Sequence, residues 1–279
     1  MSEKKMRVEI PVGKDRQRKE LFIIKIGGNV IDDDQALFSF LKDFSSIKAK
    51  KILVHGGGKI ATSIGDKLGI QSKYIDGRRI TDDKTIDLVT MVYGGLVNKK
   101  IVACLQSLKC FSIGLTGADA NLMPARKRAV KEIDYGWAGD VDADDINTDT
   151  WQMFLDDGLV PVLAPLTHDS HGHILNTNAD TMAAVLSVSL SKRYEVKLIY
   201  CFEKDGVLEN VNDDTSIITQ LDSNLYQQLK ENKKLNAGIL PKIDNAFDAV
   251  NNGAQTVIIG NSSNVSQLIN GESGTKISG

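Results

Sequence analysis

Two glycine clusters and two lysines are the residues whose types and spacing could do chemistry in this 279-residue chain. Gly27 and Gly28 follow an apolar run that contains Lys25, and glycines 56–58 follow a second apolar run. Glycines where a strand gives way to a helix let backbone N–H groups turn toward a bound anion. A lysine in an apolar strand costs desolvation energy unless an anion compensates it, although a lysine at a sheet edge can also reach solvent. The pattern favours phosphate binding over a pair of ordinary tight turns.

The glycine clusters do not fit the two commonest nucleotide motifs. A Walker loop needs a glycine five places before its Gly-Lys pair and a hydroxyl residue after it, but Leu53 and Ile60 occupy those places around Gly58-Lys59. The dinucleotide pattern G-x-G-x-x-G is absent as well. A nicotinamide-dependent dehydrogenase is therefore disfavoured.

Two later segments add polar side chains beside predicted helices. Asn176, Asn178 and Asp180 precede an apolar helical stretch, and Lys242 lies near the start of another amphipathic stretch. Asparagine and aspartate are common helix caps, but three such side chains in five positions exceed what one cap needs. A lysine near a helix N-terminus is opposed by the helix dipole. We interpret both segments as ligand-binding.

Two other clusters have simpler explanations. The stretch 167–173, THDSHGH, holds three histidines but has the glycine and serine of a polar turn, and no cysteine or well-spaced carboxylate accompanies it. The basic run at 126–131 suits a solvated strand face. We predict no protein-held metal and no nucleic-acid surface.

Composition sets wider bounds. Hydrophobic residues make up 42% and charged residues 25%, and the formal net charge is −2. This balance gives no reason to expect nucleic acid or an anionic membrane as a partner. No uninterrupted apolar run approaches the roughly 20 residues of a membrane helix, and the first 20 residues lack the apolar core of a secretory signal. The three cysteines are isolated, so a cytoplasmic location is predicted.

The elements that must position these residues alternate along the chain. Residues 21–26 and 51–55 are short apolar runs typical of buried strands, and helical spacing follows each of them. A longer helical pattern covers 82–108, and residues 122–147 suggest a hairpin excursion. Strands separated by helices predict an α/β protein with a mainly parallel open sheet sandwiched between helices.

The chain divides into an arm and two predicted lobes. Residues 1–20 form an N-terminal arm whose apolar residues alternate with period two and which contains Pro11 and Gly13, so no amphipathic helix is expected there. Residues 21–190 form an N-terminal lobe for substrate binding and dimerisation. Residues 191–279 form a C-terminal lobe for nucleotide binding.

Five segments occur in an order that identifies a known family. They are IIKIGGN, VHGGG, DGRRITD, LNTNAD and AGILPK, spread over residues 23–242. The chain resembles the amino acid kinase family, and within it the enzymes that phosphorylate the side-chain carboxylate of an N-acylated glutamate. That nucleophile is ionised at neutral pH, with an ordinary pKa of about 4.3, so the reaction needs positive charge and positioning rather than a base.

The resemblance implies a role for each matching residue. Lys25 and Lys242 would neutralise the transferring phosphoryl group, and Asp180 would orient both lysines. The residues implied to bind the acylated amino acid are Gly57, Gly58, Arg79, Asn176 and Asn178, with Arg79 gripping the α-carboxylate. The residues implied to bind phosphate or nucleotide are Gly27, Gly28, Glu203, Asp205, Gly206 and Gly238. The implied cofactor is ATP, with Mg²⁺ carried on its phosphates, and the implied assembly is a homodimer.

Some features leave alternatives open. Residues 202–207 read FEKDGV where the family usually shows T-D-V-x-G-V, so the ATP contacts differ. Trp137 and Ala138 lie in the hairpin that would cover the acyl group, so N-succinylglutamate or an aminoadipate derivative stays open as a substrate. A non-catalytic sensor on the same fold would not need both lysines and Asp180. The absence of a helical arm predicts a dimer that does not respond to arginine.

Overall fold

The computed structural model describes residues 18–279 except 76, 211, 233 and 236–237, so the predicted N-terminal arm lies almost wholly outside the described residues. The strands are β1 Glu20–Ile26, β2 Lys50–His55, β3 Lys73–Ile75, β4 Arg78–Ile80, β5 Ser112–Leu115, β6 Ala125–Lys127, β7 Gly139–Val141, β8 Val160–Leu163, β9 Leu166–His168, β10 Ile174–Asn176, β11 Glu195–Phe202, β12 Val207–Leu208, β13 Ile217–Ile218, β14 Gln220–Leu221, β15 Thr256–Asn261 and β16 Thr275–Ile277. The α-helices are α1 Gly28–Asp32, α2 Asp34–Ser46, α3 Gly58–Lys67, α4 Asp83–Val89, α5 Asn98–Ser107, α6 Thr148–Asp156, α7 Ala179–Ser191, α8 Ser223–Glu231, α9 Leu240–Asn251 and α10 Val265–Asn270. A π-helix, η1, spans Thr90–Val97, and 3₁₀ turns span Asp119–Asn121 (η2), Ala143–Asp145 (η3) and Ser262–Asn264 (η4).

The central sheet confirms the predicted fold class. Within the described residues it has eight strands in the order β14-β16-β15-β11-β1-β2-β8-β5. β1 pairs in parallel with both β11 and β2, and only the β15–β16 pair is antiparallel. The sheet is continuous from β1 to β11, across the boundary predicted near residue 190, so the division into lobes stays a prediction. Parallel pairing brings the carboxyl ends of these strands to one edge, where α/β proteins bind ligands.

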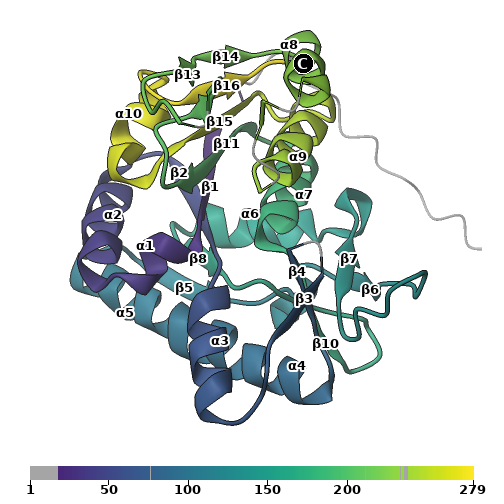
Figure 1. Cartoon of the computed structure of the whole chain (residues 1–279). Coiled ribbons are helices and arrows are strands. Elements are labelled where there is room, and N and C mark those ends of the chain that lie inside the picture. The colour runs from purple at the N-terminus through teal and green to yellow at the C-terminus, as the bar shows by residue number, and fades with distance from the viewer. Residues whose placement is uncertain (1–17, 76, 211, 233, 236–237) are drawn as a thin grey trace, which may run out of the picture.

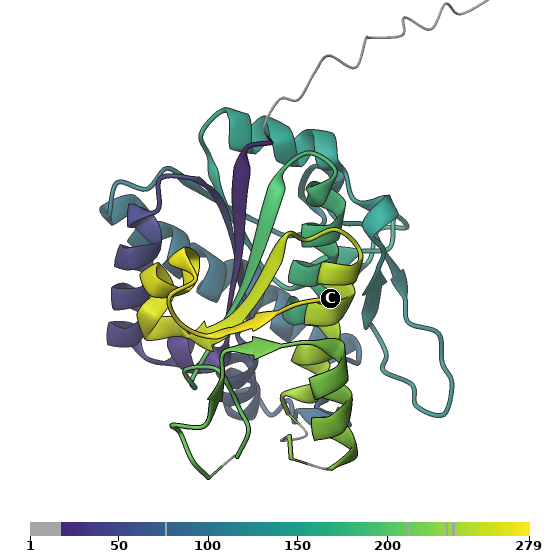
Figure 2. The same cartoon turned by 90° about the horizontal axis from the view of Figure 1, so that it is seen from above.

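Helices cover both faces of the sheet (Figures 1 and 2). Figure 2 shows α7 and α9 on one side of the strands and α2 with α10 on the other. Side chains of β1 alternate between the two cores: Leu21 and Ile23 pack with α7, whereas Phe22 and Ile24 pack with α2. Because neighbouring strand residues point to opposite faces, Lys25 lies on the α7 side.

One long helical stretch runs without a break from Asp83 to Ser107 through α4, η1 and α5. By length and mean hydropathy, 1.4, it could span a membrane, which the sequence alone did not predict because polar residues interrupt its apolar run. Leu88, Val92 and Ile101 are buried in the core that α2 also lines. The core helix of a globular protein shows the same composition.

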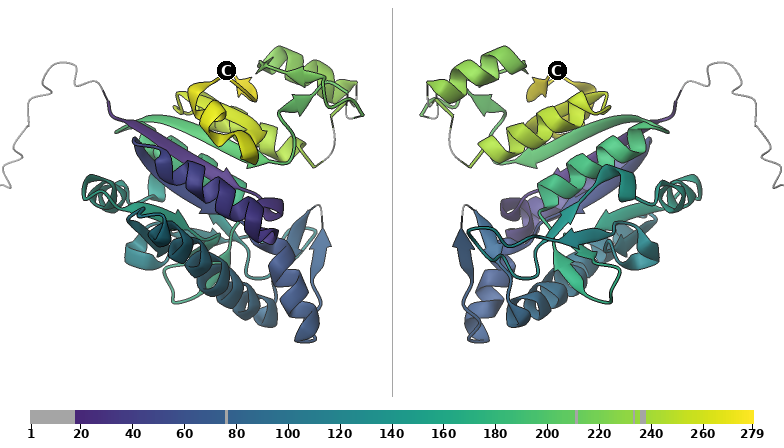
Figure 3. Two further views of the ribbon diagram at one scale, coloured as in Figure 1. Left: turned by 90° about the vertical axis from the view of Figure 1, so that its left-hand side faces the viewer. Right: turned by 90° about the vertical axis from the view of Figure 1, so that its right-hand side faces the viewer.

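Within the described residues, four two-stranded antiparallel sheets accompany the main sheet (Figure 3), and one of them pairs β12 with β13. β6 pairs with β7, which confirms the hairpin predicted within 122–147. β9 pairs with β10 around the histidine-rich turn, and β3 pairs with β4. These hairpins carry side chains from distant parts of the sequence to the carboxyl edge of the sheet.

Candidate functional site

Lys25, Asp180 and Lys242 meet in one buried cluster, although they come from β1, α7 and α9. Lys25 Nζ lies 2.6 Å from Asp180 Oδ1, and Lys242 Nζ lies 3.2 Å from Asp180 Oδ2. The Lys25 and Asp180 side chains are only 8% and 12% exposed, whereas Lys242 is 24% exposed. Tyr200 donates a 2.9 Å hydrogen bond to the Asp180 carbonyl and holds the first turn of α7. Two cations thus share one carboxylate.

The charge state of this cluster follows from its contacts. Burial pushes the pKa of Asp180 upward, but the positive charges of Lys25 and Lys242 outweigh burial and hold the pKa below its ordinary value. Asp180 Oδ1 has no well-directed hydrogen bond among the described residues, so its 2.6 Å contact with Lys25 acts mainly as an ion pair. One carboxylate cannot neutralise two ammonium groups. The cluster therefore keeps net positive charge for an anion.

The second glycine cluster forms a sharp turn between β2 and α3. Gly57 has φ +153°, a conformation that side chains rarely adopt, and a Cβ there would lie 3.0 Å from the Tyr93 ring. Gly58 begins α3, so the first N–H groups of that helix lack helical partners. The turn thus offers backbone donors at the carboxyl edge of the sheet. Gly27 is the N-cap of α1, which begins at Gly28 directly after β1.

Arg79 is 7% exposed and lies beside α3. Its guanidinium donates to the Gly58 carbonyl at 2.9 Å and to Thr62 Oγ1 at 3.0 Å, contacts the Ser72 hydroxyl, and lies 4.7 Å from the centre of the Tyr74 ring. These contacts fix the plane of the guanidinium next to the glycine turn. A fixed fork is suited to a carboxylate.

The two asparagines of the NTNAD segment have different contacts. Asn176 donates to Thr81 Oγ1 at 3.0 Å, and its backbone N–H donates to the Trp137 carbonyl at 2.8 Å. Asn178 is the N-cap of α7 and accepts a 3.0 Å hydrogen bond from the Thr181 N–H. The Asn178 side-chain oxygen is therefore the helix cap that the sequence allowed as an alternative to ligand binding. Asn176 instead links β10 to Thr81, the residue directly after β4.

Two cavities adjoin the lysine–aspartate cluster. One measures about 210 Å³, and its lining includes Arg79, Asn176 and Ala179, the residue before Asp180. The other measures about 270 Å³, and Lys242 forms part of its wall together with apolar side chains such as Leu235 and Ile239. Asp180 and its lysines therefore stand between a polar cavity and a largely apolar one.

The residues expected on the nucleotide side separate into two groups. Glu203, Gly206 and Gly238 line the larger cavity. Asp205 is absent from that lining and instead accepts a 2.9 Å hydrogen bond from Asn261 Nδ2.

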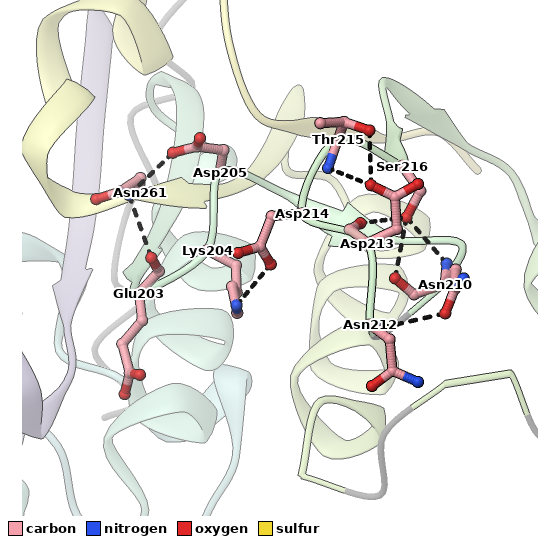
Figure 4. A network of polar contacts seen from close by, with 10 residues as sticks. All are labelled: Glu203, Lys204, Asp205, Asn210, Asn212, Asp213, Asp214, Thr215, Ser216 and Asn261. Carbon is pink, nitrogen blue, oxygen red and sulfur yellow. Dashed lines mark hydrogen bonds and ion pairs between the residues drawn. The ribbon is translucent and has the colours of Figure 1, made fainter.

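Figure 4 shows this loop from close by. The Asn261 amide also reaches the Glu203 carbonyl at 3.1 Å, and Lys204 pairs with Asp214 at 2.6 Å across to the β12–β13 connection. The Glu203 carboxylate points away from these contacts. The FEKDGV loop is therefore held by polar contacts with Asn261 and Asp214.

The histidine-rich turn forms a local cluster. His173 Nδ1 lies 2.7 Å from Asp169 Oδ2, and the ring stacks on Trp137 with centres 4.9 Å apart. Burial opposes ionisation of Asp169, but hydrogen bonds from His171 and His173 lower its pKa to about 2. Across the described residues, no group of three histidine, cysteine or acidic side chains could hold a metal ion.

Several residues of the polar cavity were not predicted from the sequence. They are Tyr74, Arg78, Tyr93, Arg128 and Tyr135. Tyr93 comes from η1 and Arg128 and Tyr135 from the β6–β7 connection, far from any glycine motif. Arg78 alone stood next to a recognised residue, inside DGRRITD.

This arrangement of sheet, glycine turns and paired lysines is that of a nucleotide-dependent small-molecule kinase fold, and the chain belongs to the amino acid kinase family, whose model matches residues 20–261. The family predicted from the five motifs is thereby confirmed. The acetylglutamate kinase of Cytophaga hutchinsonii is 52% identical over 253 residues, which cover 90% of this chain and 95% of that protein. The acetylglutamate kinase of Parabacteroides distasonis is 49% identical over 249 residues, which cover 89% and 97%. Among solved structures, smu.665 from Streptococcus mutans UA159 matches with a TM-score of 0.75 and 27% identity, covering 92% of this chain and 98% of that one.

Proposed function

We propose that this protein transfers the γ-phosphoryl group of ATP to the side-chain carboxylate of N-acetyl-L-glutamate in arginine biosynthesis. A carboxylate oxygen forms a bond to the γ-phosphorus, the bond from that phosphorus to the β–γ bridging oxygen breaks, and ADP leaves. The observation that carries the proposal is the Lys25–Asp180–Lys242 cluster between two cavities. The two acetylglutamate kinases that match about nine-tenths of the chain support the same reaction.

The cluster supplies what this reaction lacks. An ionised carboxylate needs no base, but it must approach a phosphate that is also negative. Lys25 and Lys242 offset that repulsion as charge builds on the γ-phosphoryl oxygens, and Asp180 holds both lysines in place beforehand. The N–H groups of Gly28 and Gly57 add donors, with Gly27 shaping the first turn. Preorganised charge of this kind stabilises the transition state more than the bound substrate.

The polar cavity would bind the acylated amino acid. We assign the α-carboxylate to Arg79, whose guanidinium is already fixed beside Gly58. Gly57, Gly58 and Asn176 would hold the acylated amide, and Asn178 would support them from the start of α7. The larger cavity would hold ATP against its apolar wall, with Glu203, Gly206 and Gly238 in contact and Asp205 bracing the loop.

Magnesium is part of the proposal as a companion of the nucleotide. The Asp180 carboxylate is occupied by two lysines, and the described residues provide no acidic cluster for a divalent ion. Phosphate oxygens and water are ligands that Mg²⁺ accepts readily. Bound there, it would withdraw charge from the phosphates while the protein positions them.

One observation favours a second acyl group, succinyl. Arg78 and Arg128 line the polar cavity together with Arg79, and among the residues that the structure describes no acidic side chain does. N-acetylglutamate brings one carboxylate besides the one that reacts, whereas N-succinylglutamate brings two. Arg128 already pairs with Asp140, which partly offsets its charge. N-succinylglutamate is therefore our second candidate substrate.

We also propose that the protein works as a cytoplasmic homodimer formed through its N-terminal lobe. In the described part of the chain β5 ends the sheet, and Met91 and Leu96 on η1 and Phe111 before β5 are exposed apolar residues. Covering such residues is a common reason for association. The expected lack of response to arginine depends on the arm, which lies outside the described residues, and stays a prediction. Light scattering on wild type and Leu96→Glu, with an arginine titration of activity, tests both points.

One assay tests the reaction itself. Purified protein is supplied with MgATP and, in turn, N-acetylglutamate, N-succinylglutamate, glutamate and aspartate, and ADP release is followed together with trapping of the acyl phosphate by hydroxylamine. We expect the highest kcat/KM with an N-acylated glutamate. Preference for free glutamate or aspartate, or no turnover with any of the four, would refute the proposal.

A further inference from the structure

A buried chain of hydrogen bonds runs from the glycine turn through His55 to Asn98. His55 is the last residue of β2 and is fully buried, with Nδ1 2.7 Å from the carbonyl oxygen of Gly56. Its Nε2 lies 3.1 Å from Nδ2 of Asn98, which is also fully buried. None of the five family motifs explains Asn98, and the proposed chemistry uses neither residue directly.

The contacts of Asn98 determine which ring nitrogen of His55 carries the proton. Asn98 Nδ2 also donates to the Val162 carbonyl at 2.9 Å, and Asn98 Oδ1 accepts from Lys99 at 3.0 Å, so the amide orientation is fixed. The amide nitrogen can only donate, hence Nε2 of His55 accepts and its proton sits on Nδ1. That proton is donated to the Gly56 carbonyl. Burial lowers the pKa of His55 to about 4, so the ring is neutral at ordinary pH.

Because η1 is a π-helix, the continuous stretch of η1 and α5 contacts the region of the glycine turn at two points. Tyr93 packs on Gly57, where a Cβ would lie 3.0 Å from its ring, and Asn98 reaches His55 from five residues further on. The Asn98 N–H donates to the Tyr93 carbonyl, the i to i−5 bond of a π-turn. In a regular α-helix, residues five apart differ in direction by about 140°. The π-turn therefore brings Tyr93 and Asn98 toward the same face.

We infer that His55 and Asn98 are positioning residues that fix the peptide between Gly56 and Gly57, and through it the direction of the backbone donors that the glycine turn offers to the acylated substrate. The inference rests on the proposed function, since it assigns the turn to substrate binding. Holding the Gly56 carbonyl fixes the plane of that peptide, and the adjoining Gly57 N–H lies in the same plane. Glycine alone would leave this peptide free to rotate.

Two substitutions of His55 separate positioning from mere filling of space. In His55→Asn, the side-chain amide reaches roughly where Nδ1 was and can still donate to the Gly56 carbonyl. In His55→Gln, the longer amide reaches roughly where Nε2 was and retains the Asn98 contact, but it loses the contact with Gly56. Glutamine fills more of the space occupied by the histidine ring than asparagine does. If His55 served only to fill that space, His55→Gln would therefore retain more thermal stability and activity than His55→Asn.

The expected result is the opposite order in kinetics. His55→Asn should retain kcat/KM for the acylated amino acid within about tenfold of wild type, whereas His55→Gln should lose about 10- to 100-fold, the scale of a misplaced group near the reacting centre. KM for ATP should stay near the wild-type value in both. Calorimetric titration with the acylated amino acid should show the same order without turnover.

Asn98→Leu provides an independent variant of similar volume that cannot orient His55, and it should resemble His55→Gln. Ser187→Ala is the matched control, because Ser187 is a fully buried polar residue of α7 whose hydroxyl bonds only within its own helix in the described structure. Glutamine performing at least as well as asparagine, or Asn98→Leu with wild-type kcat/KM, would overturn the inference. Because wild type is assayed alongside, failure of the proposed reaction appears as an inactive parent protein.

Discussion

The two cavities beside Asp180 are built in contrasting ways. The lining of the polar cavity includes arginines, tyrosines and asparagines, and partly buried hydrogen bonds tie Arg79 to Gly58 and Asn176 to Thr81, residues far apart in sequence. The larger cavity is lined by apolar side chains, including Phe202, Val207, Leu208 and Leu235, and the polar network of its loop is exposed (Figure 4). Directional contacts select a substrate, whereas apolar contacts tolerate small changes. If the proposed function is right, the contrast predicts substrate specificity on the Arg79 side and general nucleotide affinity on the Leu235 side.

The largest effect is expected where the two cavities meet. Lys25→Ala or Lys242→Ala should lower kcat by about 10²-fold or more, because a preorganised charge is lost from the transition state. KM for either substrate should change less. Steady-state kinetics on folded variants measure this, and Lys197→Ala, which removes a lysine that pairs with Glu20 on the neighbouring strand, is the control. Wild-type kcat in a folded Lys25→Ala protein would rule out the mechanism.

The next effect should appear only on the polar side. Arg79→Lys keeps the charge but loses the planar fork, so KM for the acylated amino acid should rise at least about tenfold while KM for ATP stays nearly constant. Varying each substrate at saturation of the other measures the split. The control is Arg126→Lys at an exposed hairpin arginine. A rise in KM for ATP instead would move Arg79 to the nucleotide side.

The reciprocal effect should be smaller. Leu235→Ala removes part of an apolar wall, so KM for ATP should rise by a few-fold, in line with about 25 cal/mol for each Å² of lost apolar contact. KM for the acylated amino acid should not change. The same two-substrate kinetics measure this, and Arg79→Lys gives the opposite pattern. If Leu235→Ala raised KM for ATP and KM for the acylated amino acid equally, the proposed division of roles between the two cavities would be wrong.

The smallest effect concerns acid stability. Contacts with Lys25 and Lys242 hold the pKa of Asp180 below its ordinary value of 3.8. A lowered pKa in the folded state stabilises the fold above the unfolded pKa, and that stabilisation is lost as pH falls through the folded value. Wild type should therefore lose free energy of unfolding more steeply below about pH 4 than Asp180→Asn does. Denaturant titrations at pH 5 and pH 3 measure the difference, and parallel pH profiles would contradict the assigned ion pairs.

Much of the fold could be predicted from sequence because its signals are local. The runs at 21–26 and 51–55 became β1 and β2, and the helical pattern at 82–108 became one helical stretch. The glycines stood at strand ends as expected, since turn geometry depends on neighbouring residues. The π-turn was not predicted, because no residue pattern distinguishes it from a weakened α-helix near Gly94 and Gly95. The separation of Asp205 from the cavity was missed because it depends on Asn261, 56 residues away.

The sequence by itself determined the chemistry available: two lysines, an aspartate and two glycine turns, in an order that identified the family. Only the tertiary structure decided how these residues are used. It placed Asp180 between Lys25 and Lys242, made Asn178 both the N-cap of α7 and part of the polar cavity's lining, and brought Asn98 to His55 across 43 residues. The physical reason is that residue type and local spacing fix backbone propensity, whereas the distance between side chains from separate elements is set by how those elements pack.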